Sequence, residues 1–158
     1  MSSTVMVALR VKATPARTFR VFTEQVGLWW RPNGLFAFTD GEPGVPSFEG
    51  GEGGRFVETL SDGQVFEIGR IRVWEPGARL VFGWRTARFG PEHHTEVEVR
   101  FDAVGEETRV TVTHRGWETV PTAHAARHGW PDGVFLTREG EWWRTMLQAL
   151  AGPTALDG

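Results

Sequence analysis

The region from residue 55 to residue 115 constrains the fold more than any other part of the chain, because it reads as five strands in succession. Apolar and polar residues alternate over 55–60, 65–74, 79–86, 95–103 and 108–115. A period of two is typical of strands with one buried face. The intervening sequences SDG, EPGA, RFGPEH and VGEE contain turn-forming residues. We therefore expect a five-stranded antiparallel meander.

The residues before the meander predict one more strand, two short helices and a long loop. Alternation over 5–11 indicates the strand. The pair Thr14-Pro15 is a typical helix start, so we expect one helix over 15–23 and a second short one over 26–30. Residues 39–54 are rich in Gly, Pro, Glu and Ser, which indicates a long exposed loop that could act as a lid.

The residues after the meander predict a short helical turn over 123–128 and a long final helix. Asp132 can cap this helix, and Gly152-Pro153 is expected to end it at about residue 151. One stripe of the helix, expected to face the sheet, consists of Leu136, Gly140, Trp143, Leu147 and Leu150. We expect a single α+β domain over 1–158, with its core at about 4–151 and its helices on one face of the sheet.

Composition excludes several classes of function. The chain has no cysteine, so it has no disulfide, thiolate nucleophile or cysteine-based metal site. Its net charge is -3 and its basic residues are scattered, which argues against a nucleic-acid partner. No apolar run reaches the roughly 18 residues of a membrane span, and the first residues do not resemble a signal peptide. We therefore expect a cytoplasmic protein with no membrane span.

The aromatic content predicts a strongly apolar interior. The chain has eight tryptophans and eleven phenylalanines but no tyrosine. Aromatic side chains of this bulk either fill a core or line a ligand cavity, and strand phase alone leaves both alternatives open. If there is a cavity, its expected lining is Trp30, Phe56, Phe82, Trp84, Val97, Val99, His114, Leu136, Gly140, Trp143 and Leu147.

Several segments resemble one protein family. They are TPARTFRVFTE followed by LWW, the glycine pair in EGGRF, the block GRIRVWEPGARLVFGW, the hairpin TEVEVRFDAVGEETRVTVTHRGW, and EWWRTMLQAL near the end. Together they resemble AHSA-type proteins, the homologues of the activator of the heat-shock-protein-90 ATPase. That family lies within the START or birch-pollen-allergen-like (SRPBCC) superfamily. The likeness extends from about Val5 to Leu150.

The resemblance implies a helix-grip fold. In this fold a curved antiparallel sheet wraps a long C-terminal helix, two short helices follow the first strand, and an apolar cavity lies between sheet and helix. The resemblance implies much less about activity. The superfamily includes lipid carriers, hormone receptors, cyclases, ring-hydroxylase subunits and co-chaperones, and a shared fold does not fix a function.

His114 is the first candidate for chemistry. In the run VTVTHRGW it shares the phase of Val110 and Val112, so it points inward at the end of a strand. An imidazole at that place can bind a ligand or act as a base. No serine or aspartate stands beside it in the sequence. Acid-base work requires a placed partner, so the pattern favours an ordinary structural histidine.

Two strand carboxylates are the next candidates. If Phe56 and Ile71 point inward, a period of two turns Glu58 and Glu67 inward as well, where they could serve as general acid and base. The alternative is that neighbouring arginines neutralise them, since buried charges are normally compensated. A β-bulge could also reverse the phase.

The remaining histidines and glycines predict no metal and no cofactor. His124 and His128 have i, i+4 spacing, but the segment HAARH lacks the glutamate of the zinc-protease motif, so we expect a surface pair. His93 and His94 are expected in a solvated turn. The runs EGGEGG and GEPG do not match the phosphate-binding motifs.

These features favour a protein that binds a small hydrophobic molecule. The sequence leaves catalysis undecided and favours its absence. One alternative is a cyclase- or hydrolase-like enzyme that uses His114 and an inward glutamate. Another is a co-chaperone-like regulator of the heat-shock-protein-90 ATPase, whose partner would be a chaperone or other protein. Either a monomer or a homodimer is compatible with the sequence.

Overall fold

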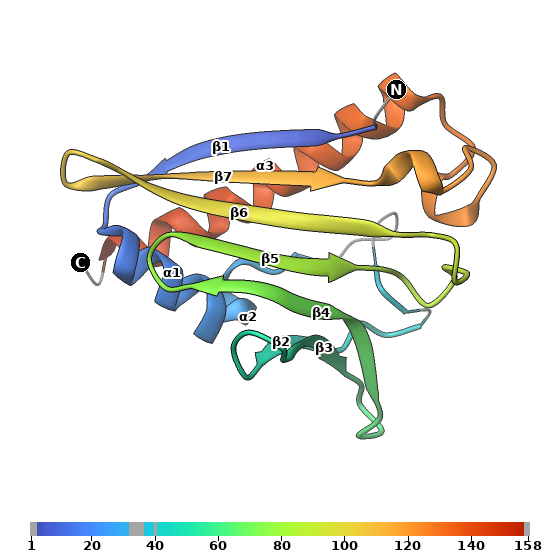
Figure 1. Ribbon diagram of the computed structural model, residues 1–158, viewed down its shortest axis with the longest axis horizontal. Helices are drawn as coiled ribbons and strands as arrows, with labels where there is room; N and C mark the ends of the chain where they lie inside the picture. The colour runs from blue at the N-terminus through green and yellow to red at the C-terminus, as the bar shows by residue number, and fades with distance from the viewer. Residues whose placement is uncertain (1–2, 32–36, 40, 157–158) are drawn as a thin grey trace.

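The computed structural model describes residues 3–31, 37–39 and 41–156, and these form a curved antiparallel sheet with helices on its concave side (Figure 1). The strands are β1 (Val5–Val11), β2 (Val45–Glu49), β3 (Arg55–Thr59), β4 (Val65–Glu75), β5 (Arg79–Trp84), β6 (Thr95–Val104) and β7 (Glu107–Arg115). The α-helices are α1 (Pro15–Glu24), α2 (Val26–Trp29) and α3 (Asp132–Leu156). Two 3-10 turns, η1 (Trp117–Thr119) and η2 (Ala125–Arg127), connect β7 to α3.

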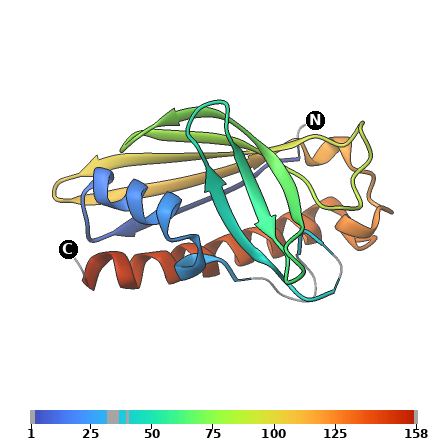
Figure 2. The ribbon, with the colours of Figure 1, turned by 90° about the horizontal axis from the view of Figure 1, so that it is seen from below.

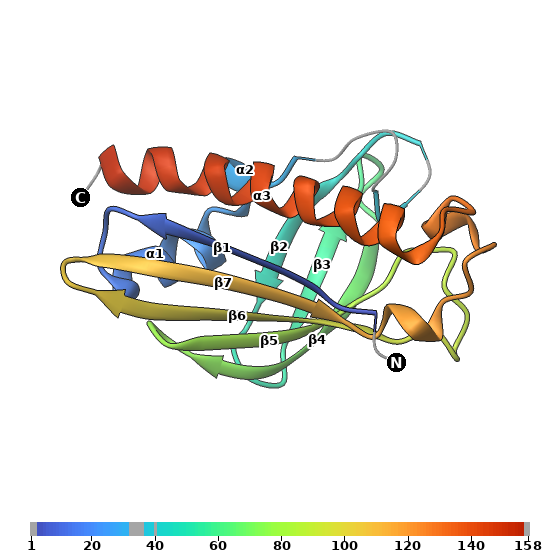
Figure 3. The same cartoon turned by 90° about the horizontal axis from the view of Figure 1, so that it is seen from above.

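The sheet confirms the predicted α+β helix-grip architecture. Its strand order is β1-β7-β6-β5-β4-β3-β2, so every consecutive pair from β2 to β7 is a hairpin, and β1 closes the far edge beside β7. Figure 3 shows α3 running along β1 and β7, while Figure 2 shows β2 and β3 curling toward the helices. Because the strands twist and the outer hairpin bends, the sheet wraps around the helix.

The prediction of one long loop over 39–54 is wrong for its central residues, which form β2. Its residues pair with β3 from Val45 opposite Thr59 to Glu49 opposite Arg55. Pro46 has no N–H to donate, which made a strand unexpected, but β2 lies at the edge of the sheet, where a proline is tolerated. The segment therefore extends the sheet instead of forming one long loop.

Strand β4 contains two register shifts, one against β3 at Phe56 and Val57 and one against β5 after Ile71. Gly69 lies at the first shift, where the backbones of β4 and β5 approach so closely that a β-carbon would be 2.0 Å from the Gly83 carbonyl oxygen. A bulge changes which face the following side chains occupy. This change decides the position of Glu67, described below.

Helix α3 is longer than expected, and its expected inner stripe is confirmed at Trp143, Leu147 and Leu150 but not in the first turns. It continues through Pro153 to Leu156, because Thr154 Oγ1 donates to the Leu150 carbonyl at 2.7 Å and Arg17 Nε donates to the Thr154 carbonyl at 3.0 Å. Leu136 and Gly140 are only half-buried. The buried stripe consists of Phe135, Glu139, Trp142, Trp143, Met146, Leu147 and Leu150. In the part of the chain that is described, no helix is long and apolar enough to span a membrane.

The segment between β7 and α3 is fixed by a buried arginine. Arg127 is 2% exposed, and its Nη1 donates to the carbonyls of Trp117 and Val120, each at 3.1 Å. Its Nη2 pairs with Asp132 at the start of α3. Ser3 also donates to Asp132, from Oγ at 2.8 Å. The 3-10 turns, the first residues and α3 are therefore joined through this arginine and aspartate.

We predict that this junction weakens in acid. The hydrogen bond from Arg127, followed by that from Ser3, holds the pKa of Asp132 below its ordinary value. A carboxyl with a lowered folded-state pKa stabilises the fold above the unfolded value, near 3.9, and loses that contribution as pH falls through the folded value. Asp132→Asn should therefore be less stable than the parent at pH 6, and the difference should shrink as pH falls below the ordinary value and through the lowered folded-state pKa of Asp132. Urea unfolding measures this, and Asp102→Asn on the exposed side of β6 should match the parent throughout.

A second prediction concerns the close approach of β4 and β5. Gly69→Ala should lower the free energy of unfolding by more than about 2 kcal/mol, because the new methyl group overlaps the Gly83 backbone, which cannot move without disrupting the sheet. Gly27→Ala is the matched control, since a β-carbon there meets nothing within 4 Å. Denaturant unfolding of the two variants compares them directly, and equal stability would show that the β4–β5 approach is loose.

Candidate functional site

The side chains predicted to line a central cavity are packed against one another. Nine of the eleven are buried and two, Leu136 and Gly140, are half-buried. The Trp84 and Trp143 rings lie 5.4 Å apart between centroids, and the Phe56 and Phe82 rings 5.1 Å apart. The first contact joins the sheet to α3 and the second lies within the sheet, and among the described residues no cavity is shown between sheet and helix. That these side chains contact a ligand therefore remains a prediction.

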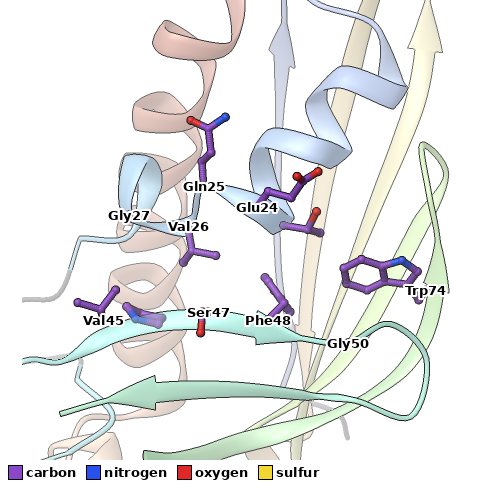
Figure 4. A pocket seen from close by; sticks show the side chains of 11 residues that line it. Glu24, Gln25, Val26, Gly27, Val45, Ser47, Phe48, Gly50 and Trp74 are labelled. Carbon is purple, nitrogen blue, oxygen red and sulfur yellow. The ribbon is translucent and has the colours of Figure 1, made fainter. Parts of the chain in front are cut away.

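An open groove lies instead between the first two helices and the edge of the sheet (Figure 4). Its volume is about 570 Å³. One wall comes from the end of α1 and from α2, and the other comes from β2 and the following turn, with Trp74 of β4 at one end. The lining residues are Thr23, Glu24, Gln25, Val26, Gly27, Val45, Pro46, Ser47, Phe48, Gly50 and Trp74.

The floor of the groove is aromatic and continuous with the core. Phe48 stacks on Phe56, with ring centroids 4.4 Å apart. Trp74 meets Phe19 edge to face at 5.2 Å. Val26 is buried beside them. Because these contacts fix the rings from below, a molecule in the groove would meet a rigid apolar surface.

The rim of the groove is negative. Glu24 is the last residue of α1, whose last turn has no basic residue. The C-terminus of a helix carries a partial negative charge, so a carboxylate there is unfavourable by about 0.3–1 kcal/mol. Glu24 forms no ion pair within the described part of the chain, not even with Arg20 one turn earlier. The groove lining itself contains no basic side chain.

His114 lies away from the groove, in a fully buried cluster that joins β6, β7 and α3. Its Nε2 is 3.1 Å from Thr95 Oγ1, and Thr95 in turn donates to the Trp84 carbonyl at 2.6 Å. Trp143 Nε1 donates to His114 Nδ1 at 3.3 Å. Glu139 Oε1 is also 3.1 Å from Nδ1, but no hydrogen bond forms between them.

These contacts determine how the imidazole can act. Thr95 has one proton and directs it to the Trp84 carbonyl, so it can only accept from His114, and Nε2 therefore carries a proton. The hydroxyl, imidazole and carboxylate are arranged like a nucleophile, its base and an orienting acid. However, the hydroxyl is committed to a carbonyl and His114 is 0% exposed. In this structure the arrangement is a structural link.

Sequence reasoning identified His114 but missed its carboxylate partner. Glu139 lies one turn after Phe135 and one turn before Trp143, on the inner stripe of α3. The expected stripe began at Leu136 and so placed Glu139 off the buried face. The signal that could have found it was the alternative three- and four-residue spacing of Phe135, Glu139, Trp142 and Met146.

The two strand carboxylates have different environments. Glu58 is buried, as strand phase predicts, and accepts hydrogen bonds from Thr39 Oγ1 at 2.7 Å and from the Gly44 N–H at 3.2 Å. Glu67 is 30% exposed and lies near Arg55 and Arg70, at 3.8 and 3.4 Å. The bulge at the β3–β4 pairing reverses its phase, so its expected inward position is wrong. No contact joins either glutamate to His114 among the described residues.

The remaining histidines also differ from expectation. His124 and His128 flank η2 instead of sharing a helix face, because η2 is a three-residue 3-10 turn and His128 ends it with φ of 58°. His124 lies against His93, with ring centroids 4.8 Å apart. His124 Nε2 is bonded to the Arg88 carbonyl and His93 Nδ1 accepts from the Gly90 N–H. In residues 3–31, 37–39 and 41–156, no group of His, Cys, Asp or Glu side chains could hold a metal ion.

Comparison with known proteins supports the resemblance noted in the sequence. Residues 12–134 match the family model for the activator of Hsp90 ATPase homolog 1-like protein. None of the curated proteins compared with the chain matches it.

Several solved structures share the fold. Mll3558 protein from Rhizobium loti is 26% identical, with a TM-score of 0.62 over 96% of each chain. CalU16 from Micromonospora echinospora is 20% identical, with a TM-score of 0.59 over 94% of this chain and 71% of that one. The Aha1 dimer from Colwellia psychrerythraea is 16% identical, with a TM-score of 0.63 over 94% of this chain and 92% of that one.

We predict that His114 stabilises the fold strongly. His114→Leu removes the imidazole that contacts Thr95, Trp143 and Glu139, so the Trp143 N–H loses its acceptor and the Glu139 carboxylate loses its neighbour at 3.1 Å. Each buried polar group that loses its partner costs about 1–3 kcal/mol. Denaturant unfolding should show a loss of this size. The same substitution at His94, whose side chain is exposed, should change stability by less than about 0.5 kcal/mol.

Proposed function

Because the chain belongs to the activator of Hsp90 ATPase homolog 1-like family, we propose that it is a ligand-binding protein of the helix-grip fold that takes up a small, largely apolar molecule without a cofactor. The groove between α1, α2 and β2 is the site that we assign to this molecule. The observation that carries the proposal is its aromatic floor beneath a volume of about 570 Å³. Small-molecule sites typically measure about 300–1,000 Å³ and combine apolar walls with a few polar groups.

The charge on the rim specifies the ligand further. Glu24 stands at the negative end of α1 and has no cationic partner among the described residues. A ligand that carries an amine or another hydrogen-bond donor would offset this charge, while its ring would lie on Phe48 and Trp74. A carboxylate or phosphate would meet Glu24 and the helix terminus with like charge. The proposed ligand is therefore a ring compound with a neutral or cationic donor group.

Catalysis forms no part of this proposal. His114 is fully buried and its polar contacts are to Thr95, Glu139 and Trp143, away from the groove lining. The family description favours one second candidate, regulation of a heat-shock-protein-90 ATPase by direct contact. An ATPase assay with the purified chaperone tests it, and unchanged turnover at saturating concentrations of this protein would remove that candidate.

We predict that the groove distinguishes phenethylamine from phenylacetate, which share a ring and differ in charge. Phenethylamine should bind more tightly by about two- to fivefold, as expected for one exposed charge pair. The measurement is an NMR titration that follows the indole N–H resonance of Trp74. Equal affinity for the two compounds would contradict the assignment of Glu24, and no response from either would contradict the groove itself.

Two variants control this experiment. Glu24→Lys should reverse the preference, because it replaces the rim carboxylate with a cation while leaving the aromatic floor intact. Ser47→Trp should fill the groove from β2 and abolish binding of both compounds. Thermal unfolding should confirm that each variant folds, and binding that survives Ser47→Trp would place the ligand elsewhere.

A further inference from the structure

We propose that His93 and His124 form an acid-sensitive contact between two loops, which holds the loops together when both imidazoles are neutral and releases them when the imidazoles are protonated. The loops are residues 85–94, between β5 and β6, and residues 116–131, between β7 and α3. Figures 1 and 3 show them side by side at the end of the molecule where α3 begins. This contact does not rest on the function proposed for the groove.

The two imidazoles join the loops directly. Their ring centroids lie 4.8 Å apart, with the rings edge to face. Phe89 packs against both rings, with centroid distances of 5.6 Å to His93 and 5.8 Å to His124, and it also meets Trp117 at 6.0 Å. The tip of the first loop is therefore held on the second loop by an aromatic cluster that contains two titratable rings.

Backbone hydrogen bonds fix the proton on each neutral imidazole. His93 Nδ1 accepts from the Gly90 N–H at 2.9 Å, and His124 Nδ1 accepts from the Ala126 N–H at 3.0 Å. Each Nδ1 is therefore unprotonated, so each neutral ring carries its proton on Nε2. His124 donates this proton to the Arg88 carbonyl at 3.0 Å, which is a second bond between the two loops.

Protonation removes the acceptors that these bonds need. An imidazolium carries a proton on both nitrogens, so each Nδ1 would point an N–H at a backbone N–H. The Ala126 bond caps η2, and the Gly90 bond closes the turn that precedes β6, so both loops would lose a local restraint. Two cations at this separation would also repel each other. Because the closed contact binds fewer protons than the separated loops, acid favours separation.

The charged neighbours in the first loop act in opposite directions. Glu92 Oε1 lies 3.2 Å from His93 Nε2 and favours a protonated ring, but the Glu92 side chain is 68% exposed, so this pair is weak. Arg88 is a cation and disfavours a further positive charge beside it. Neither residue supplies an acceptor for a proton on Nδ1 of either ring.

The charged neighbours in the second loop are engaged elsewhere. Arg127, the last residue of η2, directs its guanidinium to two backbone carbonyls and to Asp132. His128 packs against Trp130, with ring centroids 4.8 Å apart. Among the described residues, no carboxylate forms an ion pair with His124. The response of His124 to acid is therefore set mainly by its backbone bonds.

The separation is limited to the tip of the first loop. At its base, the His94 N–H donates to Thr119 Oγ1 at 2.9 Å, and Thr119 Oγ1 lies 3.2 Å from the His94 carbonyl. These groups do not titrate in mild acid, so β6 and η1 remain joined. Acid therefore moves residues 86–93 away from η2 and uncovers Phe89 and the edge of Trp117.

Hydrogen exchange at the Gly90 and Ala126 amides tests the proposal. Their protection factors, corrected for the intrinsic effect of pH on exchange, should fall at least about fivefold between pH 7.5 and pH 5.0. The limit is about 30-fold for each histidine that is neutral in the closed contact and titrates near 6.5 when released. A smaller fall at both amides would overturn the proposal. So would an equal fall at the Val99 amide in the middle of β6, because it would indicate unfolding of the whole domain.

Asparagine variants separate titration from the loss of a side chain. The double variant His93→Asn and His124→Asn keeps an acceptor oxygen near each Nδ1 position but does not titrate, so its protection factors should change by less than about twofold over the same range. His94→Asn, at the exposed histidine of the same loop, should respond like the parent. A full pH response in the double variant would contradict the role of the two histidines.

The tautomers give a further test that needs no substitution. Long-range proton–nitrogen NMR spectra of the parent at pH 7.5 distinguish a proton on Nδ1 from one on Nε2. Both His93 and His124 should show the Nε2–H form. An Nδ1–H form at either ring would remove the acceptor on which the contact depends, and the proposal would fail even if the variants do not fold.

Discussion

The contact between the inner stripe of α3 and the concave face of the sheet is the constraint on which the rest of the structure depends. Trp143 lies at its centre, with its ring 6.2 Å from Trp29 of α2 and 5.4 Å from Trp84 of β5. Its indole N–H also donates to His114 of β7. One side chain therefore joins the short helices, the middle of the sheet and the edge near β1, and the sheet must curve for all three contacts to form.

This aromatic layer explains why the groove lies at the periphery. Large rings that touch across the sheet–helix interface occupy the space where the fold would otherwise allow a hollow. At the edge, β2 is held by β3 alone, and its other side faces α1 and α2 without strand pairing. The helix ends and the strand are thus separated by a gap whose floor is formed by Phe48, Trp74 and Val26. The same rings that close the interior form the floor of the groove.

The meander and the first helix could be predicted because their signals are local: alternation, turn residues and the Thr14-Pro15 start. Strand β2 could not, because Pro46 is compatible with a strand only at an edge, and edge position is a property of the whole sheet. Glu67 was misplaced because the bulge between β3 and β4 is a property of the strand pairing, which alternation within β4 alone does not contain. Glu139 was missed because a shift of one residue in the chosen helical stripe changes which side chains are buried.

The two inward carboxylates show how burial alone fails to define a site. Glu58 and Glu139 are equally buried. Glu58 accepts hydrogen bonds from Thr39 Oγ1 and from the Gly44 N–H, so its position is explained by its anchoring of residues that precede β2. Glu139 faces an imidazole that already has other partners, so the neighbouring side chains do not account for it. Neither oxygen of Glu139 has a hydrogen-bond partner among the described residues, whereas both oxygens of Glu58 have one, so hydrogen bonding and not burial separates the two carboxylates.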